Sequence, residues 1–354
     1  MAHVRTLGAI ALLATVTLTA CAGGDESGDA TPSGATTAAP AAEADGTLTL
    51  YSGREEELIQ PLLDQFTSET GIEVEVRYAG TTELAALLQE EGDATPADVF
   101  LSQDAGALGA VAKAGLFTTL PAEIADTVVA GFTSTDASWV GVTGRARVLA
   151  YDSEALAADE VPSSVLELAE PEWAGKVGIA PSNASFQSFV TALRVLEGED
   201  VAREWLEGLV AGGAQIYPKN TAILEAVQAG EIQIGLINHY YWFRALAEQG
   251  EDAMRAQLSF PEAGDAGSIV NVTGAGLLSG AADDADALEF IEYLVSDAGQ
   301  QYFVDQTFEY PLAGDATAPE GLPALDTLTN PELDLSDLDT LGETTALLTE
   351  TGLL

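Results

Sequence analysis

The 354-residue sequence contains few of the residues that build several common kinds of functional site. Its 12 basic residues stand against 57 acidic ones, so it lacks the basic surface that a nucleic-acid-binding protein needs. With two histidines, His3 and His239, it has no multi-histidine zinc site. It also lacks the Gly-x-Ser-x-Gly motif of many hydrolases. We therefore expect no nucleic-acid partner and no enzyme, with an exported hydrolase as the least favoured alternative.

The beginning of the chain predicts export and anchoring rather than a folded domain. The apolar run over residues 7–20 is too short to span a bilayer comfortably, which is typical of a signal peptide. It ends in Leu18-Thr19-Ala20-Cys21, which resembles the bacterial lipobox, and Cys21 is the only cysteine. A buried, inert thiol is the alternative for Cys21. We predict a signal peptide over residues 1–20, a lipidated Cys21 that holds the exported chain on the outer face of the cytoplasmic membrane, and a flexible tether over residues 21–46.

The rest of the chain alternates between strand and helix patterns. Thr47–Tyr51 and residues 72–78 alternate apolar and polar side chains, which indicates strands, while residues 55–70 carry apolar side chains at helical spacing. A second set of such elements begins near Arg147, and this order favours an α/β fold of two lobes joined by hinge strands, with an interlobe ligand cleft. We expect the first lobe to hold residues 47–147 and 271–322, and the second to hold residues 148–270 and 323–354.

Three short polar segments follow predicted strands or open predicted helices. They are Tyr51-Ser52-Gly53-Arg54-Glu55, Pro181-Ser182-Asn183-Ala184-Ser185 and Ile237-Asn238-His239-Tyr240-Tyr241-Trp242. Ligands of open α/β sheets bind beyond the carboxyl ends of the strands, so we expect these segments at the cleft. The second segment opens a helix and Asn220 precedes another, where free backbone N–H groups attract an anion.

The adjacent tyrosines Tyr240 and Tyr241 are candidate metal ligands. Two adjacent tyrosines converge on one point only where the chain leaves strand geometry. A phenolate is a hard anionic donor that suits Fe(III), and a trivalent cation displaces the phenol proton despite an ordinary pKa of about 10. The pair alone has a structural alternative, two core or rim tyrosines, but a nearby anion pocket favours a trivalent ion because two phenolates balance only two of its charges. We expect His239 to pack at the rim rather than to bind metal.

Nine short segments between residues 47 and 312 carry a resemblance to a known family. They are Leu50-Tyr51-Ser52-Gly53, Pro96-Ala97-Asp98-Val99-Phe100, Gly144-Arg145-Ala146-Arg147-Val148, Tyr151-Asp152, Pro218-Lys219-Asn220, Gly230-Glu231-Ile232, Leu236-Ile237-Asn238, Tyr240-Tyr241-Trp242 and Glu309-Tyr310-Pro311-Leu312. On these segments the chain resembles the bacterial periplasmic ferric-ion-binding proteins of ABC iron importers. The resemblance implies the two-lobed periplasmic-binding-protein fold, Fe(III) as cargo, a synergistic anion (carbonate or phosphate), and an ABC permease and ATPase as partners. We expect a monomer that meets the membrane through its lipid anchor only.

The resemblance assigns roles to particular residues and also shows departures from the family pattern. It places the paired tyrosine ligands on Tyr240 and Tyr241. In the first lobe, Glu55 stands where many members have histidine, and Gln103, followed by Asp104, stands where many have glutamate. Glu55 is the candidate carboxylate ligand, with a solvated or helix-capping charge as its alternative, and Gln103 is a second candidate. The implied anion-binding positions are Asn183, Ala184, Ser185, Asn220 and Asn238.

The same residues leave a second cargo open. Arg54, Arg145 and the anion pocket also suit a binding protein for a small anion such as a phosphonate, or for another small solute, in the same cleft. For Arg145 and Arg147 we expect structural ion pairs, with support of the cleft or binding of the anion as the alternative. The leading hypothesis is an extracytoplasmic substrate-binding lipoprotein of an ABC importer that holds Fe(III) through paired tyrosinates and a synergistic anion.

Overall fold

The computed structural model describes residues 44–328 and 333–354. The predicted signal peptide, Cys21 and the tether as far as residue 43 lie outside the described residues. The last two residues of the predicted tether belong to the fold, because the backbone N–H groups of Asp45 and Gly46 donate to the carboxylate of Asp286 at 2.9 and 2.8 Å. The prediction was therefore wrong for these two residues. Their N–H groups tie the chain to a helix before the first strand begins.

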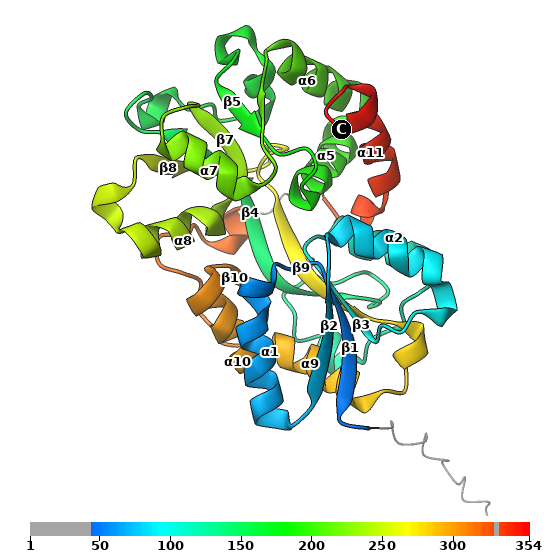
Figure 1. Cartoon of the computed structure of the whole chain (residues 1–354). Coiled ribbons are helices and arrows are strands. Elements are labelled where there is room, and N and C mark those ends of the chain that lie inside the picture. The colour runs from blue at the N-terminus through cyan, green and yellow to red at the C-terminus, as the bar shows by residue number, and fades with distance from the viewer. Residues whose placement is uncertain (1–43, 329–332) are drawn as a thin grey trace, which may run out of the picture. The chain divides into compact units, whose positions relative to one another are not determined.

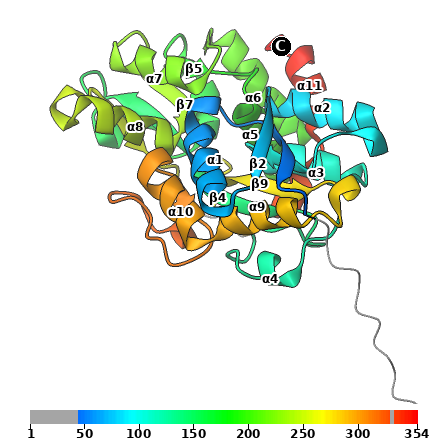
Figure 2. The ribbon, with the colours of Figure 1, turned by 60° about the horizontal axis from the view of Figure 1, so that its bottom comes forward.

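The fold begins with a group of parallel strands in which β1 (Thr47–Ser52) lies between β2 (Glu73–Tyr78) and β3 (Val99–Ser102). Helices flank these strands on both sides: in Figures 1 and 2, α1 lies on one side of β1 and β2, and α2 lies on the other. The ring of Phe66 in α1 meets Phe290 in α9 at a centroid distance of 5.1 Å, so α1 and α9 share one apolar layer. The elements are β1 (Thr47–Ser52), α1 (Glu56–Thr70), β2 (Glu73–Tyr78), α2 (Thr81–Glu91), β3 (Val99–Ser102), α3 (Ala105–Lys113), α4 (Ala122–Ala125) and α9 (Ala285–Val295).

Strand β4 (Val140–Asp152) links the two groups of strands. As far as Ala146 it pairs with β9 (Val270–Leu277), and from Arg147 onward it pairs with β7 (Ile234–Asn238). Strand β9 also pairs with β3, so β4 and β9 together carry the sheet from one lobe into the other, as Figure 1 shows. The change of partner falls between Ala146 and Arg147. Side chains near this point therefore lie where the two lobes meet.

In the second lobe, three helices start at one edge of a parallel group of strands. Strand β5 pairs in parallel with both β6 and β7, so their carboxyl ends lie at the same edge. Helices α5, α7 and α8 begin shortly after β5, β6 and β7 in turn, which gathers three helix N-termini there. The elements are β5 (Val177–Ile179), α5 (Ala184–Glu197), α6 (Glu199–Ala211), β6 (Gln215–Ile216), α7 (Asn220–Gln228), β7 (Ile234–Asn238), α8 (His239–Gln249) and β8 (Ala256–Ser259), which pairs with β4.

The segment after α9 contacts elements of both lobes. Helix α10 (Asp297–Tyr302) leads to β10 (Tyr310–Pro311), which pairs antiparallel with the first part of β4. The last helix, α11 (Leu341–Glu350), packs against α5 and α3. Among the described residues, no helix combines the length and the apolar character that crossing a membrane would need.

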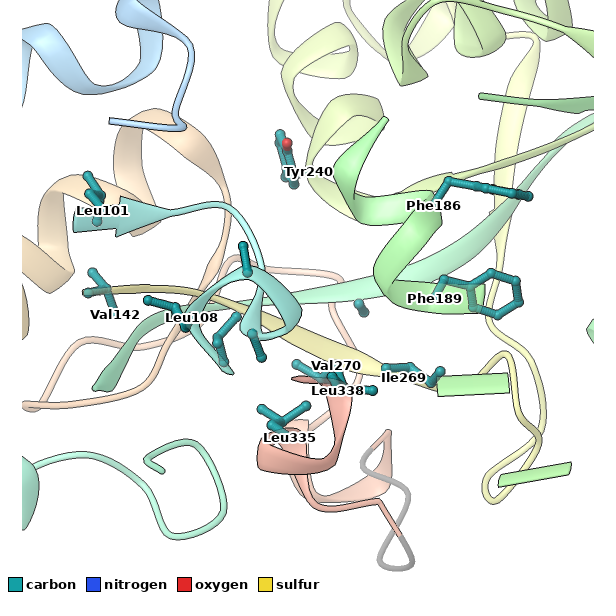
Figure 3. Packing of buried hydrophobic residues seen from close by; sticks show 14 of the residues in the cluster. Leu101, Leu108, Val142, Phe186, Phe189, Tyr240, Ile269, Val270, Leu335 and Leu338 are labelled. Carbon is teal, nitrogen blue, oxygen red and sulfur yellow. The ribbon is translucent and has the colours of Figure 1, made fainter. Parts of the chain in front are cut away.

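Residues 335–350, which we call the C-terminal strap, contact helices of both lobes. Leu335 and Leu338 belong to the buried apolar cluster (Figure 3). A Cβ added at Gly106 of α3 would lie 2.9 Å from the carbonyl oxygen of Leu338, so the strap meets the backbone of α3 closely. On the other lobe, Arg194 of α5 bonds Glu343 of α11 at 2.6 Å. The strap therefore bridges α3 and α5.

The structure confirms the predicted α/β class and most of the predicted elements. The strands expected at residues 47–51 and 72–78 and the helix expected at 55–70 appear as β1, β2 and α1, with their ends shifted by a few residues. The sequence did not reveal that β4 spans 13 residues, because its two halves have different partners. The residue limits of the two lobes stay a prediction.

Candidate functional site

Tyr240 and Tyr241 lie in the first turn of α8, directly after β7 ends at Asn238. Successive side chains on a helix differ by about 100°, whereas on a strand they point to opposite faces, so both rings stay near one another. Their centroids are 4.1 Å apart, with 30° between the ring planes. Both residues are buried, and in Figure 3 the Tyr240 ring lies between Leu101 near the end of β3 and Phe186 near the start of α5. The chain therefore leaves strand geometry directly before the tyrosine pair, which allows the two rings to lie side by side.

The hydroxyl group of Tyr240 is enclosed without a hydrogen-bond partner among residues 44–328 and 333–354. Burial raises the pKa of Tyr240 well above its ordinary value, and the neighbouring Tyr241 raises it further, while the guanidinium groups of Arg54 and Arg145 lower it. The phenol keeps its proton at neutral pH. A ligand that binds Oη as phenolate has to displace that proton, which is chemistry suited to a highly charged metal ion.

Arg54, directly after β1, is held by a buried carboxylate from the far end of the chain. Its Nη1 and Nη2 donate to the two carboxylate oxygens of Glu309 at 2.9 and 3.1 Å, and both side chains are fully buried. Thr143 and Thr307 donate to the same carboxylate, and the Nε of Arg145 lies 4.0 Å from it. Glu309 therefore compensates Arg54 and lies within ion-pair distance of Arg145. For Arg145 the expected structural ion pair is present, although long.

Arg147 differs from this pattern, and the expectation of an ion pair was wrong for it. Among the described residues, no carboxylate oxygen lies within 4.0 Å of its guanidinium group, although the residue is 3% exposed. Its Nη1 donates to the Oγ of Ser185 and to the Oδ1 of Asn238, both at 3.3 Å, and its Nη2 donates to the carbonyl oxygen of Leu236. Burial lowers the pKa of Arg147 to about 9. The side chain is thus a buried cation bonded to neutral groups.

The structure brings four of the five expected anion-binding residues into one hydrogen-bond network. The Oγ of Ser185 donates to the Oδ1 of Asn183 at 2.6 Å, and the Nδ2 of Asn220 donates to the Oγ of Ser185 at 3.2 Å. Arg147 connects Ser185 to Asn238. These residues lie at the starts of α5, α7 and α8, whose first-turn N–H groups have no partners within their helices. The network therefore lies where three helix N-termini favour negative charge.

A cavity of about 580 Å³ opens between residues of the two lobes. Glu55 and Gln103 line it from the first lobe, while Asn183 and Ala184, the fifth expected anion-binding residue, line it from the second. Glu55 is the N-cap residue of α1 but makes no side-chain capping bond, so the capping alternative is not what the structure shows. The tyrosines do not line this cavity. Tyr241 lines a separate one of about 280 Å³ between α1, α7 and α8.

His239 lies elsewhere than expected, and Asp104 caps a helix rather than facing a ligand. His239 is fully buried rather than at the rim: its Nδ1 accepts from the N–H of Ala146 at 3.0 Å, and its Nε2 lies 2.9 Å from the carbonyl oxygen of Phe308. Burial lowers its pKa to about 4, so it is a neutral link between β4 and the segment before β10. Asp104 caps α3 through the N–H of Ala107, and burial raises its pKa to about 6.

Oxygen donors from tyrosine dominate what this site offers a metal ion. Within the described part of the chain, no group of three or more histidine, cysteine, aspartate or glutamate residues is placed to hold a metal. Cys21, the predicted lipidation site, lies outside the described residues. Sequence reasoning gave Arg147 a place beside the anion only as an alternative to an ion pair, and it missed Glu309 as the counterion of Arg54. The signals were the scarcity of arginine and the position of Arg147 on a predicted strand beside the hinge.

Comparison with known proteins places the chain in a family. Residues 94–335 match the model of the bacterial extracellular solute-binding proteins. The Fe(3+)-binding periplasmic protein of Serratia marcescens is 35% identical over 318 residues, which are 89% of this chain and 93% of the relative. The major ferric iron-binding protein of Neisseria meningitidis serogroup B is 35% identical over 321 residues, 90% of this chain and 96% of the relative.

Solved structures give the same result. The iron-bound HitA from Pseudomonas aeruginosa is 33% identical, with a TM-score of 0.82 over 86% of this chain and 99% of that protein. The FutA protein of Trichodesmium in complex with iron and citrate is 30% identical, with a TM-score of 0.72 over 87% of this chain. These relatives are two-lobed binding proteins of transport systems and not enzymes. The chain therefore belongs to the bacterial periplasmic ferric-ion-binding family of extracellular solute-binding proteins.

Proposed function

We propose that this protein binds Fe(III) through the phenolate oxygens of Tyr240 and Tyr241, together with a synergistic anion, and delivers it to an ABC importer. The observation that carries the proposal is the buried tyrosine pair, in which the Oη of Tyr240 has no hydrogen-bond partner among the described residues. A buried polar group without a partner is costly, so its retention suits a ligand that is present during function. Relatives named for ferric-iron binding support the choice of ion.

The second lobe supplies the setting for the anion. Asn183, Ser185, Asn220 and Asn238 lie at the starts of three helices, and Ala184 offers the first amide of α5 beside the cavity. An anion bound here adds to the negative charge around Fe(III) and fills coordination positions that the two phenolates leave open. Carbonate and phosphate both fit this requirement.

The first lobe supplies the remaining candidates for metal coordination. Glu55 lies at the cleft without a capping bond, and its carboxylate is a hard oxygen donor suited to Fe(III). Gln103 lines the same cavity and offers an amide oxygen. We propose Glu55 as the first-lobe ligand and Gln103 as a second contact, both reaching the ion when the lobes close on it.

The proposal also covers the limits of the two lobes and the place of the protein in the cell. The change of partners along β4 between Ala146 and Arg147 supports lobes of residues 47–147 with 271–322, and of 148–270 with 323–354. The lipobox-like segment that ends at Cys21 supports lipid anchoring of a monomer outside the cytoplasmic membrane. Extracellular solute-binding proteins pass their cargo to an ABC permease and ATPase, which are therefore the expected partners.

A ferric titration tests the metal site directly. Iron-free protein is titrated with ferric nitrilotriacetate in the presence of phosphate, and the visible phenolate-to-iron charge-transfer band is recorded. We expect a band that is lost in Tyr240→Phe and in Tyr241→Phe. Tyr51→Phe serves as the control, because its hydroxyl group bonds Glu91 away from the pair and should leave the band unchanged. Absence of the band in the unmodified protein would refute the proposal.

The buried guanidinium groups favour one second candidate, a binding protein for a small anion such as a phosphonate. Arg147 lies beside the network without a carboxylate partner among the described residues. Calorimetry with phosphate and methylphosphonate on iron-free protein separates the two. Anion binding with no charge-transfer band at any iron concentration would favour the second candidate.

A further inference from the structure

Two polar atoms that lie close together are buried without hydrogen-bond partners in the described part of the chain. One is the Oη of Tyr240, and the other is the Nε of Arg54. Tyr240 is fully buried, and so is the side chain of Arg54. The guanidinium carbon of Arg54 lies 6.0 Å from the centroid of the Tyr240 ring. A donor and an acceptor, each costly to leave unpaired, are therefore neighbours.

Arg54 is the buried arginine that lies nearest to a role at the tyrosine pair. Among the described residues, its guanidinium group makes a cation–π contact with Tyr240, whereas that of Arg147 lies over two phenylalanine rings of α5. Arg54 also lines the cavity of about 580 Å³ that Tyr240 does not line. The side chain of Arg54 therefore borders both the cavity and the tyrosine pair.

The contacts of Arg54 hold its guanidinium group in place and leave the Nε–H unused. Its Nη1 and Nη2 donate to the carboxylate of Glu309 at 2.9 and 3.1 Å, and Nη1 also donates to the Oγ1 of Thr273 at 2.9 Å. Glu309 balances the charge of Arg54, so the pair as a whole is neutral. A neutral pair can lie beside a trivalent cation with little repulsion, while Arg54 keeps one donor available.

The two unpaired atoms belong to different groups of strands. Arg54 follows β1, and Tyr240 lies in the first turn of α8, directly after β7. A movement of one lobe against the other therefore changes the distance between the Nε and the Oη. Closure of the lobes on an ion is a movement that can bring them into hydrogen-bond contact.

We propose that Arg54 is a positioning residue of the iron site, whose Nε–H donates a hydrogen bond to the ligating oxygen of Tyr240 when iron is bound. The inference rests on the proposed function, in which this oxygen binds Fe(III) as phenolate. An anionic oxygen accepts a stronger hydrogen bond than a neutral phenol, so the bond favours the iron-bound state. Groups that bond a metal ligand from behind also fix its orientation. Glu309 in turn orients Arg54.

Arg54→Lys tests the bond itself. Lysine has a methylene group where arginine has its Nε–H, and it keeps a positive charge for Glu309. The ferric protein is formed with ferric nitrilotriacetate, the maximum of the charge-transfer band is recorded, and the affinity is measured by competition with nitrilotriacetate. We expect the band to move to longer wavelength, because a phenolate that loses a hydrogen bond donates charge to Fe(III) more readily. The affinity should fall by about ten- to a hundredfold.

Two further variants separate the bond from the general stability of the network. Thr143→Val is the matched control, because it removes a hydrogen bond of 3.1 Å to the same Glu309 carboxylate but leaves Arg54 intact. It should leave the band and the affinity unchanged. Arg54→Met combined with Glu309→Gln removes the donor and its counterion together, so it leaves no buried charge unpaired. This double variant should reproduce the shift of Arg54→Lys.

The outcomes distinguish this inference from the proposed function. A band of unchanged wavelength in Arg54→Lys would overturn the role of Arg54 and leave the iron site standing. A lower affinity without a shift would do the same, because it indicates a structural effect alone. If Arg54→Lys does not fold, the double variant decides by the same two measurements. A band missing from the unmodified protein would overturn the iron site, and this inference with it.

Discussion

Replacing Tyr240 with phenylalanine should make the iron-free protein more stable while abolishing its response to iron. The Oη of Tyr240 is buried and has no hydrogen-bond partner among the described residues. Leaving a buried hydroxyl group unpaired costs about 1–3 kcal/mol, and phenylalanine keeps the ring and its packing against Tyr241 while removing that cost. We therefore expect Tyr240→Phe to raise the free energy of unfolding by about 1–3 kcal/mol without iron.

Urea denaturation with and without ferric nitrilotriacetate measures both effects in one assay. Iron should shift the midpoint of the unmodified protein upward, because a ligand that binds the folded state stabilises it, but should leave Tyr240→Phe unchanged. Tyr51→Phe is the matched control: its hydroxyl group bonds Glu91, so we expect a small loss of stability and a full response to iron. An iron-free Tyr240→Phe variant that is less stable than the unmodified protein, or one that iron still stabilises, would refute this reasoning.

Three further predictions concern buried ionisable groups. Iron affinity at fixed free Fe(III) should rise with pH, because Tyr240, with its raised pKa, loses a proton on binding; a pH-stat should detect this proton, and its absence would contradict phenolate ligation. Glu309→Gln should destabilise the fold by about 3–5 kcal/mol, measured by urea denaturation, because it leaves Arg54 buried without its partner. Burial lowers the pKa of His239 to about 4, below its unfolded value of about 6.5, so stability should fall by about 3 kcal/mol as the pH drops from 6.5 to 4; His239→Gln should flatten this part of the profile.

The local part of the fold was predictable from the sequence because alternation and helical spacing are properties of short segments. The pattern at Thr47–Tyr51 predicted β1, and the run of polar residues around Asn183 predicted the start of α5. Tyr240 and Tyr241 were singled out because the nearby anion pocket and the resemblance to ferric-ion-binding proteins favoured a metal site over a structural pair. The sequence did not show that they begin a helix, since a strand end and a helix start look alike there.

The contacts that set the charge of the site were not predictable because they join distant parts of the chain. Glu309 is 255 residues from Arg54, and no local pattern indicates that they pair. Arg147 was expected to have a carboxylate partner, as buried charges usually do. Its surroundings depend on the partner change along β4, which only the three-dimensional pairing with β7 and β9 reveals.

The C-terminal strap bears on how much free energy a ligand has to supply for the two lobes to close. Two-lobed proteins close on ligands by hinge motions, and the strap contacts α3 on one lobe and α5 on the other. If the lobes separate, we expect the strap to leave one of them and to expose apolar side chains such as Leu338. The open and closed states would then differ in free energy before any cargo arrives, and a ligand would supply only the remainder of the shift in population. We therefore expect residues 335–350 to influence the affinity of a cavity that they do not line.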